Sequence, residues 1–121
     1  MKDELTEKII GCALEVHKVL GPGLLESLYE EALCQEFDIQ KLHYSRQKEI
    51  HVHYKGRKLG ILKLDLLVAE QVIVEIKSLT QLPEVALAQI LSYLKATGLK
   101  RGLILNFGHA RLVEGIKRVS L

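Results

Sequence analysis

Apolar residues recur at three- and four-residue spacing in the first third of the chain. Over residues 3–20 this spacing predicts a helix with one apolar stripe, made of Leu5, Ile9, Cys12, Ala13, Val16 and Leu20. Gly21-Pro22-Gly23 stops that helix and turns the chain. Residues 24–38 are predicted to form a second helix, whose apolar face holds Leu25, Leu28, Ala32 and Phe37. So short a connection predicts an αα-hairpin.

The period then changes from that of a helix to that of a strand. Residues 44–54 alternate, and Lys55-Gly56-Arg57 is a candidate hairpin turn before a return strand over 58–68. Residues 72–77 are apolar apart from two charges, which is typical of a strand at the centre of a sheet.

The rest of the chain adds one helix and two strands. A helix is expected from Pro83 to Thr97, a buried strand over 102–107 and a weaker strand over 111–120. The predicted order is ααβββαββ, an α/β fold in which helices flank a mixed β-sheet. At 121 residues we expect a single domain over 1–121.

Composition narrows the class of protein only slightly. Hydrophobic residues make up 48% and charged residues 26%, as in an ordinary globular domain. A net charge of +2 neither marks a strongly basic nucleic-acid binder nor excludes one. No apolar run is long enough to span a membrane, and the early acidic residues do not fit a secretory signal. Cys12 and Cys34 fall at apolar helix positions, so we expect buried thiols and a cytoplasmic protein.

Three charges stand in otherwise apolar strands. Glu75 and Lys77 are two residues apart, so their side chains leave the same face of the strand. Asp65 is a lone charge in the return strand. If residues 58–68 and 72–77 pair through the short turn between them, Asp65 and Glu75 lie on neighbouring strands. Such charges are costly unless they are paired or bind a metal ion.

Two carboxylates beside a lysine suit the hydrolysis of phosphodiesters. Mg²⁺ prefers carboxylate and carbonyl oxygens, and it polarises a phosphate and lowers the pKa of an attacking water. A lysine positions that water or offsets negative charge in the transition state. Two polar pairs on helices, Gln89 with Tyr93 and Glu26 with Tyr29, add further candidates.

The order Asp65, Glu75-Ile76-Lys77, Gln89-x-x-x-Tyr93 resembles the core of the PD-(D/E)xK nuclease superfamily. It is most similar to the Q-x-x-x-Y branch, which includes RecB-type and lambda-exonuclease-type nucleases. Gly23-x-x-Glu26-x-x-Tyr29 also resembles the signature of the small GxxExxY proteins. The resemblance covers nearly the whole chain, and Leu64 stands where the superfamily often has a proline.

This resemblance implies a restriction-endonuclease-like core and a role for each matching residue. Asp65 and Glu75 would be metal ligands, with the Ile76 carbonyl as a third and Glu26 completing the acidic cluster. Lys77 would be the catalytic lysine. The residues implied to contact substrate or orient the site are Gln89, Tyr93, Tyr29 and Arg46. The implied cofactor is Mg²⁺ or Mn²⁺.

The function that follows is a metal-dependent nuclease acting on DNA, or on RNA. The alternative is a catalytically silent nuclease-fold module that binds nucleic acid or a partner protein. A homodimer is a further expectation, since many nucleases of this fold dimerise. His51 and His53 share a strand face and suggest zinc, but no third ligand accompanies them in the sequence.

Overall fold

The computed structural model describes residues 3–121. It confirms the predicted order of helices and strands and adds one short 3-10 helix, η1, before the last strand. The helices are α1 (Glu4–Leu20), α2 (Glu26–Ile39) and α3 (Glu84–Thr97), and η1 spans Leu112–Gly115. The strands are β1 (Tyr44–Tyr54), β2 (Arg57–Val68), β3 (Val72–Lys77), β4 (Arg101–Asn106) and β5 (Ile116–Ser120).

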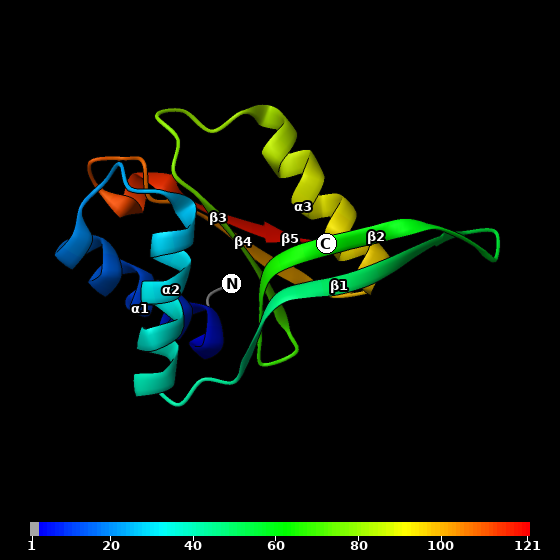
Figure 1. The fold of residues 1–121 in the computed structure, drawn as a ribbon, viewed down its shortest axis with the longest axis horizontal. Helices are drawn as coiled ribbons and strands as arrows, with labels where there is room; N and C mark the ends of the chain where they lie inside the picture. The colour runs from blue at the N-terminus through cyan, green and yellow to red at the C-terminus, as the bar shows by residue number, and fades with distance from the viewer. Residues whose placement is uncertain (1–2) are drawn as a thin grey trace.

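The five strands form one mixed sheet in the order β1-β2-β3-β4-β5, so β3 is central as predicted. β3 and β4 are parallel and α3 connects them, whereas the other neighbours are antiparallel. α1 and α2 pack on one face of the sheet and α3 packs on the other (Figure 1). The α/β fold with helices flanking a mixed sheet is therefore confirmed.

Local sequence explains where the helices begin and end. Asp3 caps α1, because its side chain accepts a hydrogen bond from the backbone amide of Thr6. After α1 the chain turns through Gly21 and Gly23, whose φ angles of 73° and 94° favour glycine. Pro83 is the residue before the first turn of α3 rather than its first helical residue.

The apolar face expected for α2 is partly wrong, because Phe37 is buried and Ala32 packs against the core but the two leucines of that face are exposed. Leu25 is 73% exposed and Leu28 is 49% exposed. The buried face consists of Tyr29, Glu30, Leu33, Cys34 and Phe37. The spacing of four residues from Tyr29 to Leu33 to Phe37 places these rings and methyl groups against α1 and the sheet. The same face of α2 also carries the acidic side chain of Glu30 toward the interior.

The β1–β2 hairpin changes faces halfway along its length. Leu66 and Val68 contact the core under α1 and α2, whereas Leu64 and Leu62 contact the core under α3. Regular strands alternate, so two even-numbered pairs on opposite faces require a break between them. On β2 the break therefore lies at Asp65, and on β1 the residue between the partners of Leu66 and Leu64 is Gln47, whose φ is 48°.

Beyond this break the hairpin leaves the body of the protein. We call residues 48–63 the β1–β2 arm; its near part packs against the core under α3, and Figure 1 shows its turn end projecting away from the helices. Its turn lies where it was predicted but is one residue shorter: Lys55 and Gly56, both at positive φ, connect Tyr54 to Arg57, which already belongs to β2.

Among residues 3–121, no helix is both long and apolar enough to cross a membrane. Cys12 and Cys34 are buried free thiols, as expected from their positions in the helical pattern.

Candidate active site

Asp65 and Glu75 meet where β2 and β3 separate. The backbone ladder between these strands pairs residues 66–68 with 72–74. Just beyond it, the Asp65 amide donates to Oε2 of Glu75 at 2.9 Å, and the Ile76 amide donates to Oδ2 of Asp65 at 2.8 Å. The two carboxylates therefore take the place of backbone acceptors, and each side chain reaches across to the other strand.

Burial of the pair makes its negative charge unfavourable. Glu75 is 5% exposed, and burial raises its pKa to about 7, with the Asp65 carboxylate adding to the effect. The Asp65 amide and Lys77 act in the opposite direction. Burial likewise raises the pKa of Asp65, opposed by the Ile76 amide and by Lys77, while Glu30 and Glu26 raise it further. The negative charge of the neighbouring carboxylates is therefore only partly offset by Lys77 and the two backbone amides.

Lys77 ends β3 on the face that carries Glu75, and it is half-buried. The backbone after it is held by the segment that follows β4. The Phe107 amide donates to the Lys77 carbonyl, and the Leu79 amide donates to Oδ1 of the fully buried Asn106. These bonds hold the backbone at the end of β3 and therefore fix the position from which the Lys77 side chain extends.

A pocket of about 330 Å³ opens between α2 and Asp65, and neither Glu75 nor Lys77 is among the residues that line it. It is lined by Glu26, Ser27, Glu30, Gln47, Asp65 and Ile76. Glu26 lines it from the exposed first turn of α2.

The sequence interpretation missed Glu30. Its Oε2 accepts hydrogen bonds from Arg46 and its Oε1 accepts one from Gln47 at 2.9 Å. The signal was present, because Glu26 and Glu30 are four residues apart and share a helix face. The error in the apolar face of α2 concealed it, since Glu30 was assigned no place in the interior.

Arg46 lies beside the site but is engaged with acidic residues of α2. It donates to Glu30 and forms an ion pair with Glu31, both at 3.0 Å. Its side chain is 39% exposed. Arg46 and Gln47 are consecutive residues that both bond Glu30, which locates the break in strand alternation.

Tyr29 lies in the core and not in the pocket. Its hydroxyl donates to the Gly21 carbonyl and accepts a hydrogen bond from the Leu24 amide, and its ring stacks on Phe107 with centroids 4.4 Å apart. Ser78, next to Lys77, donates to the Leu24 carbonyl at 2.6 Å. The tyrosine therefore holds the α1–α2 connection, and that connection contacts the end of β3.

The polar pair on α3 is divided by the structure. Tyr93 is buried, and burial raises its pKa, with further increases from Glu75 and Asp65. Its hydroxyl therefore lies within the electrostatic range of the acid pair. Gln89 is on the exposed part of α3.

The carboxylate oxygens of Asp65 and Glu75 are the kind of ligand that a hard cation such as Mg²⁺ prefers. Within residues 3–121 the structure contains no group of three histidines, cysteines or acids arranged to hold a metal ion. Mg²⁺ usually needs only one or two carboxylates, because it retains several waters. Asp65 and Glu75 supply two, and each uses one oxygen for a backbone amide. Their raised pKa values have the direction that a bound cation would reverse.

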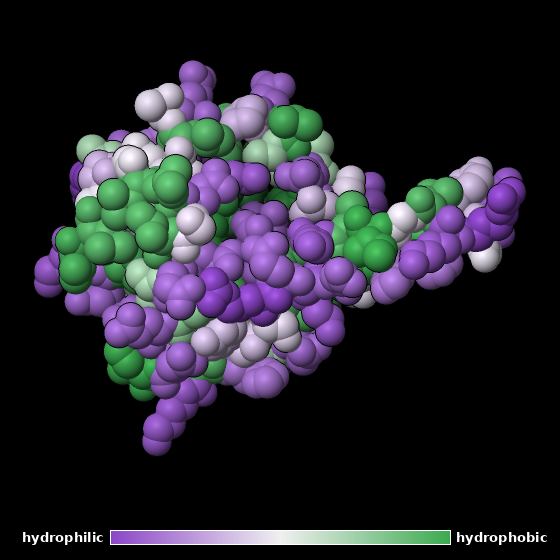
Figure 2. Space-filling model, in the orientation of Figure 1, coloured by the Kyte–Doolittle hydropathy of each residue, from purple (hydrophilic) through white to green (hydrophobic). Residues whose placement is uncertain are grey.

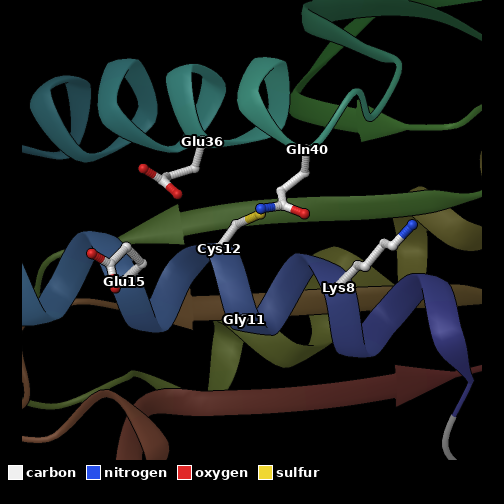
Figure 3. Close-up of a pocket in the computed structure, with 6 residues that line it drawn as sticks. All are labelled: Lys8, Gly11, Cys12, Glu15, Glu36 and Gln40. Atoms are coloured by element: carbon white, nitrogen blue, oxygen red, sulfur yellow. The ribbon is translucent and has the colours of Figure 1, made fainter.

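A larger pocket of about 470 Å³ lies between α1 and α2 (Figure 3). It is lined by Lys8, Gly11, Cys12, Glu15, Glu36 and Gln40. Burial raises the pKa of the Cys12 thiol, and Glu36 raises it further. A protonated thiol is a poor nucleophile, so this pocket does not compete with the acid pair as a catalytic centre.

Comparison with known proteins agrees with this geometry. The family model of the PD-(D/E)XK nuclease superfamily matches residues 3–119. Searches of curated proteins and of solved structures gave no match. The matched range contains the acid pair, Lys77 and every helix and strand except the last residue of β5. The chain therefore belongs to the PD-(D/E)XK nuclease superfamily.

Proposed function

We propose that the protein is a metal-dependent nuclease that hydrolyses phosphodiester bonds of DNA. The observation that carries this proposal is the reciprocal arrangement of Asp65 and Glu75, with Lys77 beside them on the central strand. Two same-sign buried charges are unfavourable in an isolated protein, and a divalent cation accounts for them.

Each residue has a distinct role in this proposal. Asp65, Glu75 and the Ile76 carbonyl hold Mg²⁺ or Mn²⁺, and Glu26 lies at the mouth of the pocket. The ion supplies charge neutralisation and a more acidic bound water. Lys77 orients the attacking water or stabilises negative charge on the phosphate. Glu30 positions Arg46 and Gln47 at the edge of the pocket, which keeps that wall rigid.

Three narrower assignments accompany the proposal. The Gly23-x-x-Glu26-x-x-Tyr29 pattern supports membership of the GxxExxY group, and the structure gives its glycine and tyrosine a shared task at the α1–α2 connection. The buried free thiols suit a cytoplasmic location. A homodimer would enlarge the surface that contacts a duplex beyond that of one small domain.

A cleavage assay tests the proposal. The wild-type protein is incubated with linear, nicked and branched DNA in Mg²⁺, in Mn²⁺ and in EDTA. We expect cleavage only with a metal ion, and a loss of at least about a hundredfold in Glu75→Gln and in Lys77→Met. The matched controls are Glu70→Gln, in the exposed turn at the far end of β3, and Lys117→Met on β5; both should cleave normally.

Two outcomes contradict the proposal. Cleavage that persists in Glu75→Gln would come from a contaminant. Binding of DNA in EDTA without cleavage under any metal condition would instead support a nuclease-fold module that only binds nucleic acid.

A further inference from the structure

The β1–β2 arm carries a net positive charge larger than that of the whole chain. Within residues 48–63 there are five lysines and arginines and a single glutamate, a formal charge of +4. The whole chain has a charge of +2, so the remaining residues carry −2. All five basic side chains are exposed: Lys48, Lys55, Arg57, Lys58 and Lys63. Figure 2 shows the arm as a projection with a hydrophilic tip.

One face of the arm is continuous with the acidic pocket. Ile50 and Leu62 are opposite one another and pack against the core under α3. Because side chains alternate along a strand, the residues directly before and after Ile50 and Leu62 point to the opposite side of the sheet, which is the α2 side. Cross-strand pairing places six residues on that side: Glu49 with Lys63, His51 with Ile61, and His53 with Lys58. We call these six the polar face of the arm. Glu26, Glu30 and Gln47 line the pocket from the same side.

The edge of the arm is unsuited to extending the sheet into a second copy. β1 is an edge strand, but its ladder is interrupted by the positive φ of Gln47 and by a register shift between Val52 and His53. Bulges and lysines on an edge strand discourage pairing with another strand. A second copy would also bring two arms of charge +4 together. The charge instead complements a polyanion.

The shape of the arm favours a particular polyanion. A two-stranded β-ribbon fits the major groove of B-form DNA, whereas the major groove of double-stranded RNA is too deep and narrow for side chains to enter. We propose that the β1–β2 arm seats double-stranded DNA, with Lys58 and Lys63 of its polar face contacting phosphates, so that the backbone passes over the pocket at Asp65. This inference rests on the proposed nuclease function and adds the substrate form and the surface that holds it.

Binding measured without turnover tests the arm separately from catalysis. Fluorescence anisotropy of a labelled DNA duplex of about two helical turns, recorded in EDTA over a range of salt concentrations, gives the affinity and its salt slope. In the double variant Lys58→Glu/Lys63→Glu we expect a loss of affinity of about tenfold or more and a salt slope smaller by about two. The control Lys100→Glu/Lys117→Glu makes the same charge change at exposed sites outside the arm.

Affinity cleavage places the DNA directly. Ile61→Cys introduces an exposed thiol on the polar face, and the native Cys12 and Cys34 are buried at 4% and 3% exposure. An iron chelate attached to this thiol should cut the bound duplex at a defined position. The same chelate on Lys117→Cys, at the far edge of the sheet, should not.

The outcomes separate the two proposals. Wild-type affinity in the arm variant overturns the arm as the DNA seat even where Glu75→Gln abolishes cleavage. Loss of binding in the arm variant, with no metal-dependent cleavage by the wild type, supports the arm and contradicts the nuclease. Tighter binding of single strands or RNA than of duplex DNA overturns the substrate form. A change of solution mass on charge reversal would assign the arm to a contact between copies and overturn the inference.

Discussion

Asp65 and Glu75 each accept a hydrogen bond from a backbone amide of the other's strand. The Asp65 amide donates to Glu75, and the Ile76 amide donates to Asp65. The exchange begins one residue past the end of the β2–β3 ladder, so the carboxylates satisfy amides that a longer ladder would have paired. The backbone of two paired strands therefore holds both carboxylates in position. This gives the site a rigid geometry together with an electrostatic penalty.

That penalty predicts how metal-free stability depends on pH. The folded-state pKa of Glu75 is about 7, above its ordinary value of 4.5. Between these values the folded protein holds the proton more tightly than the unfolded chain does, so stability falls as pH rises. Above pH 7 the full penalty applies, at most about 3 kcal/mol. Glu75→Gln removes it, so in EDTA this variant should be more stable than wild type at pH 8, as measured by urea unfolding.

At pH 4 the same comparison should show little difference, because Glu75 is then protonated in both states. The matched control is Glu70→Gln, which alters an exposed acid and should leave the pH profile unchanged. A Glu75→Gln variant that is less stable than wild type at pH 8 would mean that the ionised carboxylate is stabilising in the absence of metal.

Metal binding should act in the opposite direction to the penalty. A ligand at a hundred times its Kd stabilises the folded state by about 2.7 kcal/mol. For a domain of this size that corresponds to a rise in Tm of about 10 °C. We expect Mg²⁺ to raise the Tm of the wild type in differential scanning calorimetry and to have no such effect on Asp65→Asn. An equal rise in both proteins would place the ion elsewhere.

The sequence pattern was sufficient for the sheet but not for the walls of the site. Alternation and the apolar run predict β1 and β3 with their observed bounds, and the lone charges identify Asp65 and Glu75 as neighbours. Those signals depend only on the spacing of residues along one strand or along two strands joined by a short turn. Predicting the position of Glu30 requires knowing which face of α2 is turned toward the sheet. The packing of Tyr29 and Phe37 in the core determines that face.

The change of face at Gln47 could not be predicted for a related reason. Strand period predicts strict alternation, and nothing in Arg46-Gln47-Lys48 marks a residue with positive φ. The break is stabilised by contacts distant in the chain, because Glu30 accepts hydrogen bonds from both Arg46 and Gln47. The direction of the arm depends on this break, so the sequence alone could place its charges only near the hairpin.

The buried hydroxyl of Tyr29 should contribute to stability through the α1–α2 connection. Tyr29→Phe keeps the ring on Phe107 but removes the hydrogen bonds to Gly21 and Leu24. We expect a loss of about 1–3 kcal/mol in the free energy of unfolding. Tyr54→Phe, at a 60% exposed position on the arm, should change it very little. Because Leu24 also contacts Ser78, cleavage should fall in Tyr29→Phe more than its fraction of unfolded protein explains.

A side chain at position 108 should displace the end of β3. A Cβ on Gly108 would lie 2.1 Å from the Leu79 carbonyl oxygen and 2.5 Å from the Leu79 nitrogen. Backbone cannot move aside as a flexible side chain can, so Gly108→Ala should break the hydrogen bond from Leu79 to Asn106. We expect the free energy of unfolding to fall by about 1–3 kcal/mol and hydrogen exchange at the Leu79 amide to become faster. Cleavage should also weaken, because Lys77 is displaced.

Gly11→Ala is the matched control, because a Cβ there meets nothing within 4 Å and the residue is inside α1. Alanine favours a helix over glycine, so this variant should be more stable by up to about 1 kcal/mol. If Gly108→Ala unfolds at the wild-type urea concentration with a protected Leu79 amide, the segment after β4 does not position Lys77. The lysine would then owe its place to its own strand alone.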